Sequence, residues 1–110
     1  MYLPKSDIYN ILNSLGYYVA QVKPNVFTDL PAIIFRVGDN SINLDLDNNI
    51  LSQNLEIIVD IWAEDSATAS KVLSEVQNVM RINLYNMSFS GDVPNNGNLY
   101  HISNRFSKLV

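Results

Sequence analysis

The fold of this 110-residue chain is decided by the stretch Leu55-Glu56-Ile57-Ile58-Val59-Asp60-Ile61-Trp62-Ala63-Glu64 and by the amphipathic run that follows it to Met80. Apolar and acidic side chains alternate along the first part, which is the period of a strand with one buried face. Apolar residues then recur at helical spacing, as in a helix packed on a sheet; they are Ala69, Val72, Leu73, Val76 and Met80. The stretch therefore predicts one long strand that turns directly into one long helix.

Shorter patterns on both sides complete the predicted order of elements. A first helix with one apolar stripe can be capped by Ser6 or Asp7 and can end at Gly16. Gly38-Asp39-Asn40 has the composition of a turn. Alternation and apolar runs predict strands at residues 17–23, 32–37, 41–47, 54–64, 87–89 and 99–108, a second helix at residues 66–84, and loops at residues 24–31, 48–53 and 90–98.

The predicted fold class is α+β, with a single domain over residues 1–110. We expect a single antiparallel β-sheet with two α-helices packed on one face, because this arrangement buries both apolar helical stripes with few layers. The sequence contains no internal repeat, no low-complexity tract and no linker that would divide the domain.

The composition is that of a folded domain with an acidic balance. Hydrophobic residues make up 47% of the chain and charged residues 16%, and the formal net charge is −4. Because no basic cluster is present, the sequence argues against sequence-independent binding to a phosphate backbone. Cysteine is absent, which excludes disulfides and thiolate metal ligands. No apolar run approaches the roughly 20 residues that span a bilayer and no signal peptide is evident, so we expect no membrane association.

One segment matches the spacing of a calcium loop. Asp45, Asp47 and Glu56 occupy the first, third and twelfth positions of an EF-hand pattern. The glycine that this pattern requires at the sixth position is replaced by Ile50, and strand patterns flank the segment instead of helices. Alternating acidic residues on the wet face of a hairpin give the same spacing, so we expect no metal site.

Two further groups could carry acid–base chemistry. His101 is the only histidine, and no nucleophile elbow accompanies it, so a surface or interface role is favoured over catalysis. Glu56, Asp60 and Glu64 could pair as acid and base, although a solvated strand face gives the same spacing. We therefore expect a protein that is not an enzyme, with no catalytic residue and no cofactor.

Apolar and arginine side chains in exposed contexts mark candidate contacts. Trp62 interrupts an acidic strand face, and tryptophan is enriched where partners meet, unless the chain's own terminal segment covers it. Phe27 and Leu30 lie in a loop bounded by prolines, and they either fold back under the helices or dock into a neighbour. Arg36 and Arg105 are candidates to pair with carboxylates across an interface. Edge strands could also extend a sheet between subunits.

The whole pattern resembles the small tail-terminator, or tail-completion, proteins of long-tailed bacteriophages and prophages. The resemblance begins with the short first helix, the Pro-aliphatic strand Leu30-Pro31-Ala32-Ile33-Ile34-Phe35, and the strand from Leu55 to Ala63 with its amphipathic helix. It continues through the loop with Gly91-Asp92 into the terminal strand Tyr100-His101-Ile102-Ser103-Asn104-Arg105-Phe106, and so covers nearly the whole chain. The family has no catalytic residues to carry over.

The resemblance implies a structural virion assembly protein that caps the tail tube as a ring, commonly hexameric, and joins it to the head. The implied partners are further copies of the chain, the tail-tube protein and a head-completion protein, with DNA only as cargo in the lumen. Asp45, Asp47 and Glu56 are lumen candidates, because carboxylates would repel the passing phosphates. The implied location is the host cytoplasm during assembly and the virion tail or neck afterwards.

Two other classes of protein remain as alternatives. A head-completion or other minor capsid protein of the phage neck would use the same kind of assembly surface. A small cytosolic enzyme or ligand-binding domain would need a chemical constellation that the sequence does not offer. Solution mass separates these classes, because a ring predicts a discrete oligomer, at least on the tail tube.

Overall fold

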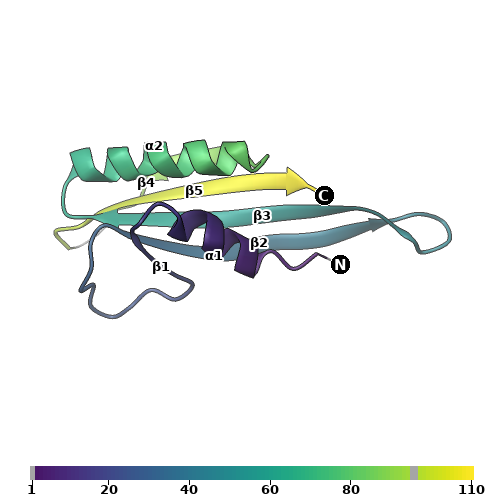
Figure 1. Cartoon of the computed structure of the whole chain (residues 1–110), viewed down its shortest axis with the longest axis horizontal. Coiled ribbons are helices and arrows are strands. Elements are labelled where there is room, and N and C mark those ends of the chain that lie inside the picture. Colours follow the sequence, from purple (N-terminus) through teal and green to yellow (C-terminus); the bar gives the residue numbers. More distant parts are fainter. Residues whose placement is uncertain (1, 95–96) are drawn as a thin grey trace.

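One sheet and one layer of helices make up the protein in this computed structural model, which describes residues 2–94 and 97–110 (Figure 1). The sheet has five strands in the order β1-β2-β3-β5-β4. Both helices contribute to one core on the same face of this sheet, so the predicted α+β fold is confirmed. The elements in chain order are α1 Lys5–Asn13, β1 Tyr18–Ala20, β2 Ala32–Leu44, β3 Ile50–Ala63, α2 Ser66–Ile82, β4 Asn86–Asp92 and β5 Tyr100–Leu109.

The stretch that decides the fold forms β3 and α2 as predicted. The odd-numbered residues of β3 from Leu55 to Ala63 point into the core beneath the helices. Asp65 then caps α2, because its carboxylate accepts a hydrogen bond from the Thr68 amide at 2.7 Å. Leu73 is only half-buried beside the fully buried stripe of α2, which is Ala69, Val72, Val76 and Met80.

The sheet is mostly antiparallel but contains one parallel pair that the sequence analysis did not predict. β1 runs parallel to β2, with Tyr18 beside Ala32 and Ala20 beside Ile34. Parallel neighbours need a crossover connection. Residues 21–31 form this connection, and β1 is shorter than the predicted strand at 17–23 because the chain leaves the sheet after Ala20.

The strands predicted at residues 32–37 and 41–47 are one continuous strand, β2, so the turn predicted at Gly38-Asp39-Asn40 is wrong. These residues keep their pairing with β3 across a register shift between Val37 and Asp39. A β-bulge of this kind takes up an extra residue without ending the strand. A Cβ at Gly38 would lie 2.7 Å from Oε1 of Glu56 and 3.0 Å from Cδ1 of Ile58, so a larger residue here would displace the ends of these two side chains.

The true turn of the β2–β3 hairpin lies at residues 45–49. The Asp45 carboxylate holds it by accepting hydrogen bonds from the Asp47 amide at 2.9 Å and the Asn49 amide at 2.8 Å. Asn48 adopts a φ of 63°, a left-handed conformation that asparagine tolerates well. As a result, β3 starts at Ile50, inside the loop predicted at residues 48–53.

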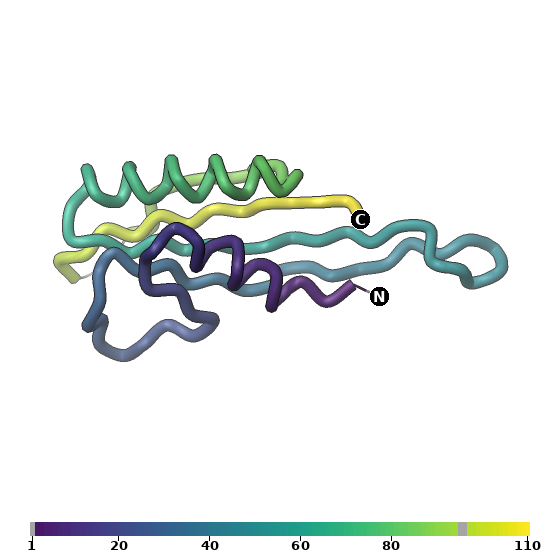
Figure 2. The backbone as a smooth tube through the Cα atoms, viewed as in Figure 1, coloured from purple at the N-terminus to yellow at the C-terminus, as the bar shows by residue number. Residues whose placement is uncertain are grey.

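The β2–β3 hairpin projects beyond both helices (Figure 2). α2 has 17 residues and spans about 26 Å, whereas β3 has 14 residues and spans about 46 Å. About 20 Å of the hairpin therefore has no helix over it. Gln53 fixes the base of this arm, because its side-chain amide bonds to both the amide (2.9 Å) and the carbonyl (2.7 Å) of Tyr2.

The start of the first helix differs from the prediction. Pro4 is the N-cap residue of α1, and no side chain bonds to the first turn, so neither Ser6 nor Asp7 is the cap. Proline suits the start of a helix because its missing N–H would have no partner there. Asp7 instead accepts a hydrogen bond from the Tyr2 hydroxyl, which ties the N-terminal segment to the helix.

The last three elements follow the predicted order with shifted ends. α2 ends at Ile82 and not at residue 84, because Leu84 has a φ of 69°, a left-handed conformation that cannot continue a right-handed helix. β4 is longer than the strand predicted at 87–89, since it pairs with β5 along its length. The loop predicted at 90–98 includes residues 95–96, which lie outside the described part of the chain.

Apolar clusters lie on both faces of the sheet. The main core lies under the helices and includes Ile8, Leu12, Phe35 and Phe106, together with the inward residues of β3 and α2. A smaller cluster lies on the opposite face, where Phe27, Leu30, Ala20 and Leu99 pack against Ala32, Ile34 and Trp62. Over the residues that the structure describes, no helix is both long and apolar enough to cross a membrane.

Candidate functional site

The face of the sheet that carries no helix, here called the open face, holds most of the residues singled out in the sequence. Register partners in neighbouring strands share a face. One such row across the sheet is Arg36 on β2, Ile58 on β3, Arg105 on β5 and Phe89 on β4. Two rows further along β3, Trp62 pairs with Ala32 and with His101.

Trp62 is covered by its own chain, so of the two alternatives for this residue the intramolecular one holds. The His101 ring stacks on the indole, with centroids 3.8 Å apart and planes 15° apart. The Phe27 ring also packs against the indole in a tilted arrangement, with centroids 5.3 Å apart, and the Lys23 ammonium sits 4.5 Å from the indole centroid. Only 7% of Trp62 remains exposed, so this side chain has little surface to offer a partner.

The loop with Phe27 and Leu30 also folds onto its own sheet. Both side chains are half-buried against the Trp62 cluster. They pack on the open face of their own subunit, so the first of the two alternatives, folding back under the helices, is wrong. The reason is the crossover from β1 to β2, which passes on the face that the helices leave free. Each side chain keeps part of its surface exposed.

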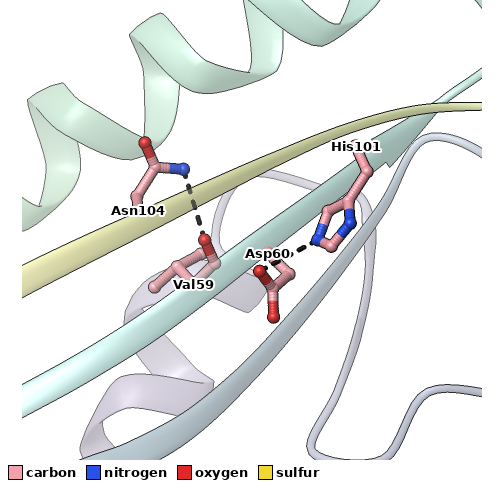
Figure 3. A network of polar contacts seen from close by, with 4 residues as sticks. All are labelled: Val59, Asp60, His101 and Asn104. Atoms are coloured by element: carbon pink, nitrogen blue, oxygen red, sulfur yellow. Dashed lines mark hydrogen bonds and ion pairs between the residues drawn. The ribbon is translucent and has the colours of Figure 1, made fainter. Parts of the chain in front are cut away.

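The His101 ring contacts the Asp60 carboxylate across two strands (Figure 3). The ring Nε2 lies 3.0 Å from Asp60 Oδ1, and both side chains are largely buried. Asp60 therefore orients the imidazole and holds it flat on Trp62. Within residues 2–94 and 97–110, no hydroxyl group is hydrogen-bonded to His101, so the pair has no nucleophile to activate there.

A buried amide on the helix-covered side was not found from the sequence. Asn104 is completely buried, and its Nδ2 donates to the Val59 carbonyl at 3.2 Å (Figure 3). Its Oδ1 accepts a hydrogen bond from the Ser90 hydroxyl at 2.6 Å. Asn104 thus ties β3, β5 and β4 together, and a polar residue inside an apolar alternation was the available signal for it.

Arg36 and Arg105 flank Ile58 on the open face. Both arginines are exposed, yet Ile58 between them is only 7% exposed, as expected when long arginine stems lie along an apolar side chain. Two strand spacings separate the arginine backbones, which is about 10 Å. In the described part of the chain, His101–Asp60 is the one ion pair, so neither guanidinium is neutralised by its own subunit.

The three lumen candidates do not form one cluster. Asp45 and Asp47 lie at the hairpin tip, and Glu56 lies about 20 Å away along β3 on the open face. The amide of Asn49, which donates to the Asp45 carboxylate, holds its pKa below the usual range, so this group stays charged in mild acid.

The exposed aliphatic side chains of the hairpin lie on the apolar side of the alternation that predicts a strand at residues 41–47. Ile42 and Leu44 continue the helix-covered face of the sheet, but they are 39% and 47% exposed because the helices stop short of them. Leu46 at the tip is fully exposed. The mismatch between strand length and helix length was the signal that these residues lie outside the core.

No model of a known protein family matches this chain, and no curated protein matches it.

Proposed function

We propose that this protein is a structural subunit of a long-tailed bacteriophage or prophage, a tail terminator that caps the tail tube as a ring and joins it to the head. The resemblance in its sequence names this class of protein. The α+β fold, with one sheet, a short first helix and a long strand–helix unit, is in keeping with it. The subunit would assemble in the host cytoplasm and remain in the virion neck.

The observation that carries the proposal is a pair of open sheet edges on opposite sides of the subunit. β1 covers β2 only from Ala32 to Ile34, so in the described chain the rest of β2 has no strand on its outer side. β4 is the other end of the sheet. Unpaired strand edges favour further strand pairing or contact. A ring needs two different contact surfaces on each subunit, and these edges supply them.

An assembly role also suits the surface chemistry. Five exposed aliphatic residues lie on the projecting hairpin, namely Ile42, Leu44, Leu46, Ile50 and Leu51. Exposed apolar groups that lie close together favour protein contacts. The net charge of −4 would keep a ring from binding the DNA that passes through its lumen.

Electron microscopy of tail tubes tests this function. The purified protein would be mixed with its cognate tail-tube protein while tubes assemble, and tube ends would be imaged. A terminator should give tubes of limited length that end in a ring, whereas tubes without the protein should grow on. Uncapped tubes together with a monomeric protein at all concentrations would contradict the proposal. A ring that binds only to heads would favour the head-completion alternative.

A further inference from the structure

We propose that the hairpin tip Asp45-Leu46-Asp47 of one copy docks on the row Arg36-Ile58-Arg105 of a second copy of this chain. The inference rests on the proposed function and deepens it, because it names a contact between subunits in addition to their sheet edges. The two surfaces have the same order of chemistry, an aliphatic side chain between two charges, and the charges are opposite.

The tip presents its groups outward. Leu46 is fully exposed and stands between the two aspartates. Asp45 Oδ1 is occupied by the turn amides, but Oδ2 contacts only the Asn49 side-chain amide, at 3.4 Å, and can accept a stronger bond. Asp47 is exposed. The tip therefore offers two carboxylates around one apolar side chain, and arginine binds carboxylates with two parallel hydrogen bonds.

The row offers the matching half. The arginine backbones lie about 10 Å apart, and Ile58 between them is only 7% exposed, so the apolar surface open to a leucine side chain is that of the arginine stems and Phe89. Phe89, which is 53% exposed, extends the apolar part of the row beside Arg105. Pairing the guanidiniums with carboxylates would satisfy two charges that have no counterion within the described subunit.

The neighbouring charges limit what can bind here. Glu56 and Asp60 lie on the open face one row to either side of Ile58. A broad acidic surface would meet these carboxylates and be repelled. A narrow tip that enters only along the row avoids them, which favours a hairpin turn as the occupant.

The tip cannot reach the row of its own subunit. Asp45 follows Arg36 by nine residues of nearly continuous strand, which is about 30 Å. The contact must therefore join two copies. Because tip and row are different surfaces, the contact is head-to-tail, and repeating it generates a ring if the rotation closes. This assigns Asp45 and Asp47 to the subunit contact and places Glu56, one row from Ile58, at the edge of that contact.

The absence of cysteine from the chain allows a direct test. Protein with Asp47→Cys would be mixed with protein carrying Arg105→Cys, oxidised mildly, and run on a non-reducing gel, alone and on tail tubes. We expect a disulfide-linked dimer from the mixture and a ladder of multimers from the double variant. Ser70→Cys, on an exposed position of α2, replaces Arg105→Cys in the matched control, which should stay monomeric. Circular dichroism checks that each variant is folded.

Exchange of charges between the two surfaces provides a second test. Arg105→Glu should weaken self-association at least tenfold in sedimentation, and Asp47→Lys in the partner should restore most of it. Cross-links at the level of the control together with no rescue would overturn the inference, and tip-to-tip cross-links would do the same. If wild-type rings still cap tubes in that case, the proposed function stands. If Arg105→Glu blocks capping without any cross-link between copies, the row binds another virion protein and the inference fails.

Discussion

Trp62 and His101 lie face to face on the open face of the sheet, with ring centroids 3.8 Å apart and ring planes 15° apart. They are register partners on β3 and β5, and Asp60 holds the imidazole from the next row. Together with the crossover loop, the stack covers one end of the open face. Within the described residues, the arginine row beyond this stack has no salt bridge to neutralise its charges.

Replacing His101 should destabilise the protein through two separable losses. His101→Ala removes the stack and leaves the Asp60 carboxylate without its partner, so we expect a loss of about 1–3 kcal/mol in the free energy of unfolding. His101→Phe keeps a ring on Trp62 and loses only the contact with Asp60, so it should cost less. Urea denaturation measures both. Equal losses for the two variants would show that the stack adds nothing.

Core substitutions should follow the observed burial and not the sequence pattern alone. Ile61 is completely buried, so Ile61→Ala should cost about 2–5 kcal/mol. Leu73 is half-buried, so Leu73→Ala should cost clearly less, although both lie on predicted apolar stripes. Urea denaturation of the two variants checks the order. A loss at Leu73 as large as that at Ile61 would contradict this packing.

The cap of α2 should make stability depend on pH in a defined direction. The hydrogen bond from the Thr68 amide, foremost among the contacts of Asp65, lowers the pKa of its carboxyl group. A lowered folded-state pKa gives stability that is present above the ordinary value of about 3.9 and is lost as pH falls through the lowered value. We expect Asp65→Ala to lower the urea midpoint at pH 7, and the gap to wild type to narrow below pH 4. A gap that widens in acid would contradict this assignment.

Calcium should not bind the segment from Asp45 to Glu56. The Asp45 carboxylate is occupied by the amides of its own turn, and Glu56 lies about 20 Å away, so the ligands cannot converge on one ion. Titration calorimetry with calcium should show no heat above dilution. A stoichiometric signal that Asp45→Ala abolishes would prove this prediction wrong.

Leu46 should matter for assembly and not for folding. Because its side chain is fully exposed, Leu46→Ser should change the free energy of unfolding by less than about 0.5 kcal/mol. The same change should weaken self-association in sedimentation velocity, since it removes the apolar centre of the tip. Leu3→Ser, at a residue that is 73% exposed and away from the tip, is the matched control.

The sequence was sufficient to predict the elements in which the spacing of apolar residues matches the buried positions. The alternation from Leu55 to Ala63 and the helical stripe after Asp65 predict β3, α2 and the helix-covered core correctly. Gly38 was misread because a bulge and a turn have the same local composition, and only the pairing with β3 decides between them. The parallel placement of β1 depends on the path of the crossover loop, which no local pattern records.

The candidate site was predictable only residue by residue. Arg36 and Arg105 were singled out separately, but the register of β2, β3 and β5 brings them to either side of Ile58. The cover of Trp62 comes from Phe27 and His101, which lie far from it in the sequence. Long-range pairing of this kind leaves no signal in a single sequence, because each partner alone is compatible with a solvated strand.

The uncovered part of the β2–β3 hairpin has a mechanical consequence. Gln53 clamps the arm to the backbone of Tyr2, and the bulge at Gly38 lies just inside this clamp. An arm of about 20 Å acts as a lever, so a change of direction by about 10° at its base moves the tip by about 3–4 Å. If the protein caps tubes as proposed, small adjustments of strand twist at the bulge would be enough to fit one kind of subunit to tubes of slightly different diameter.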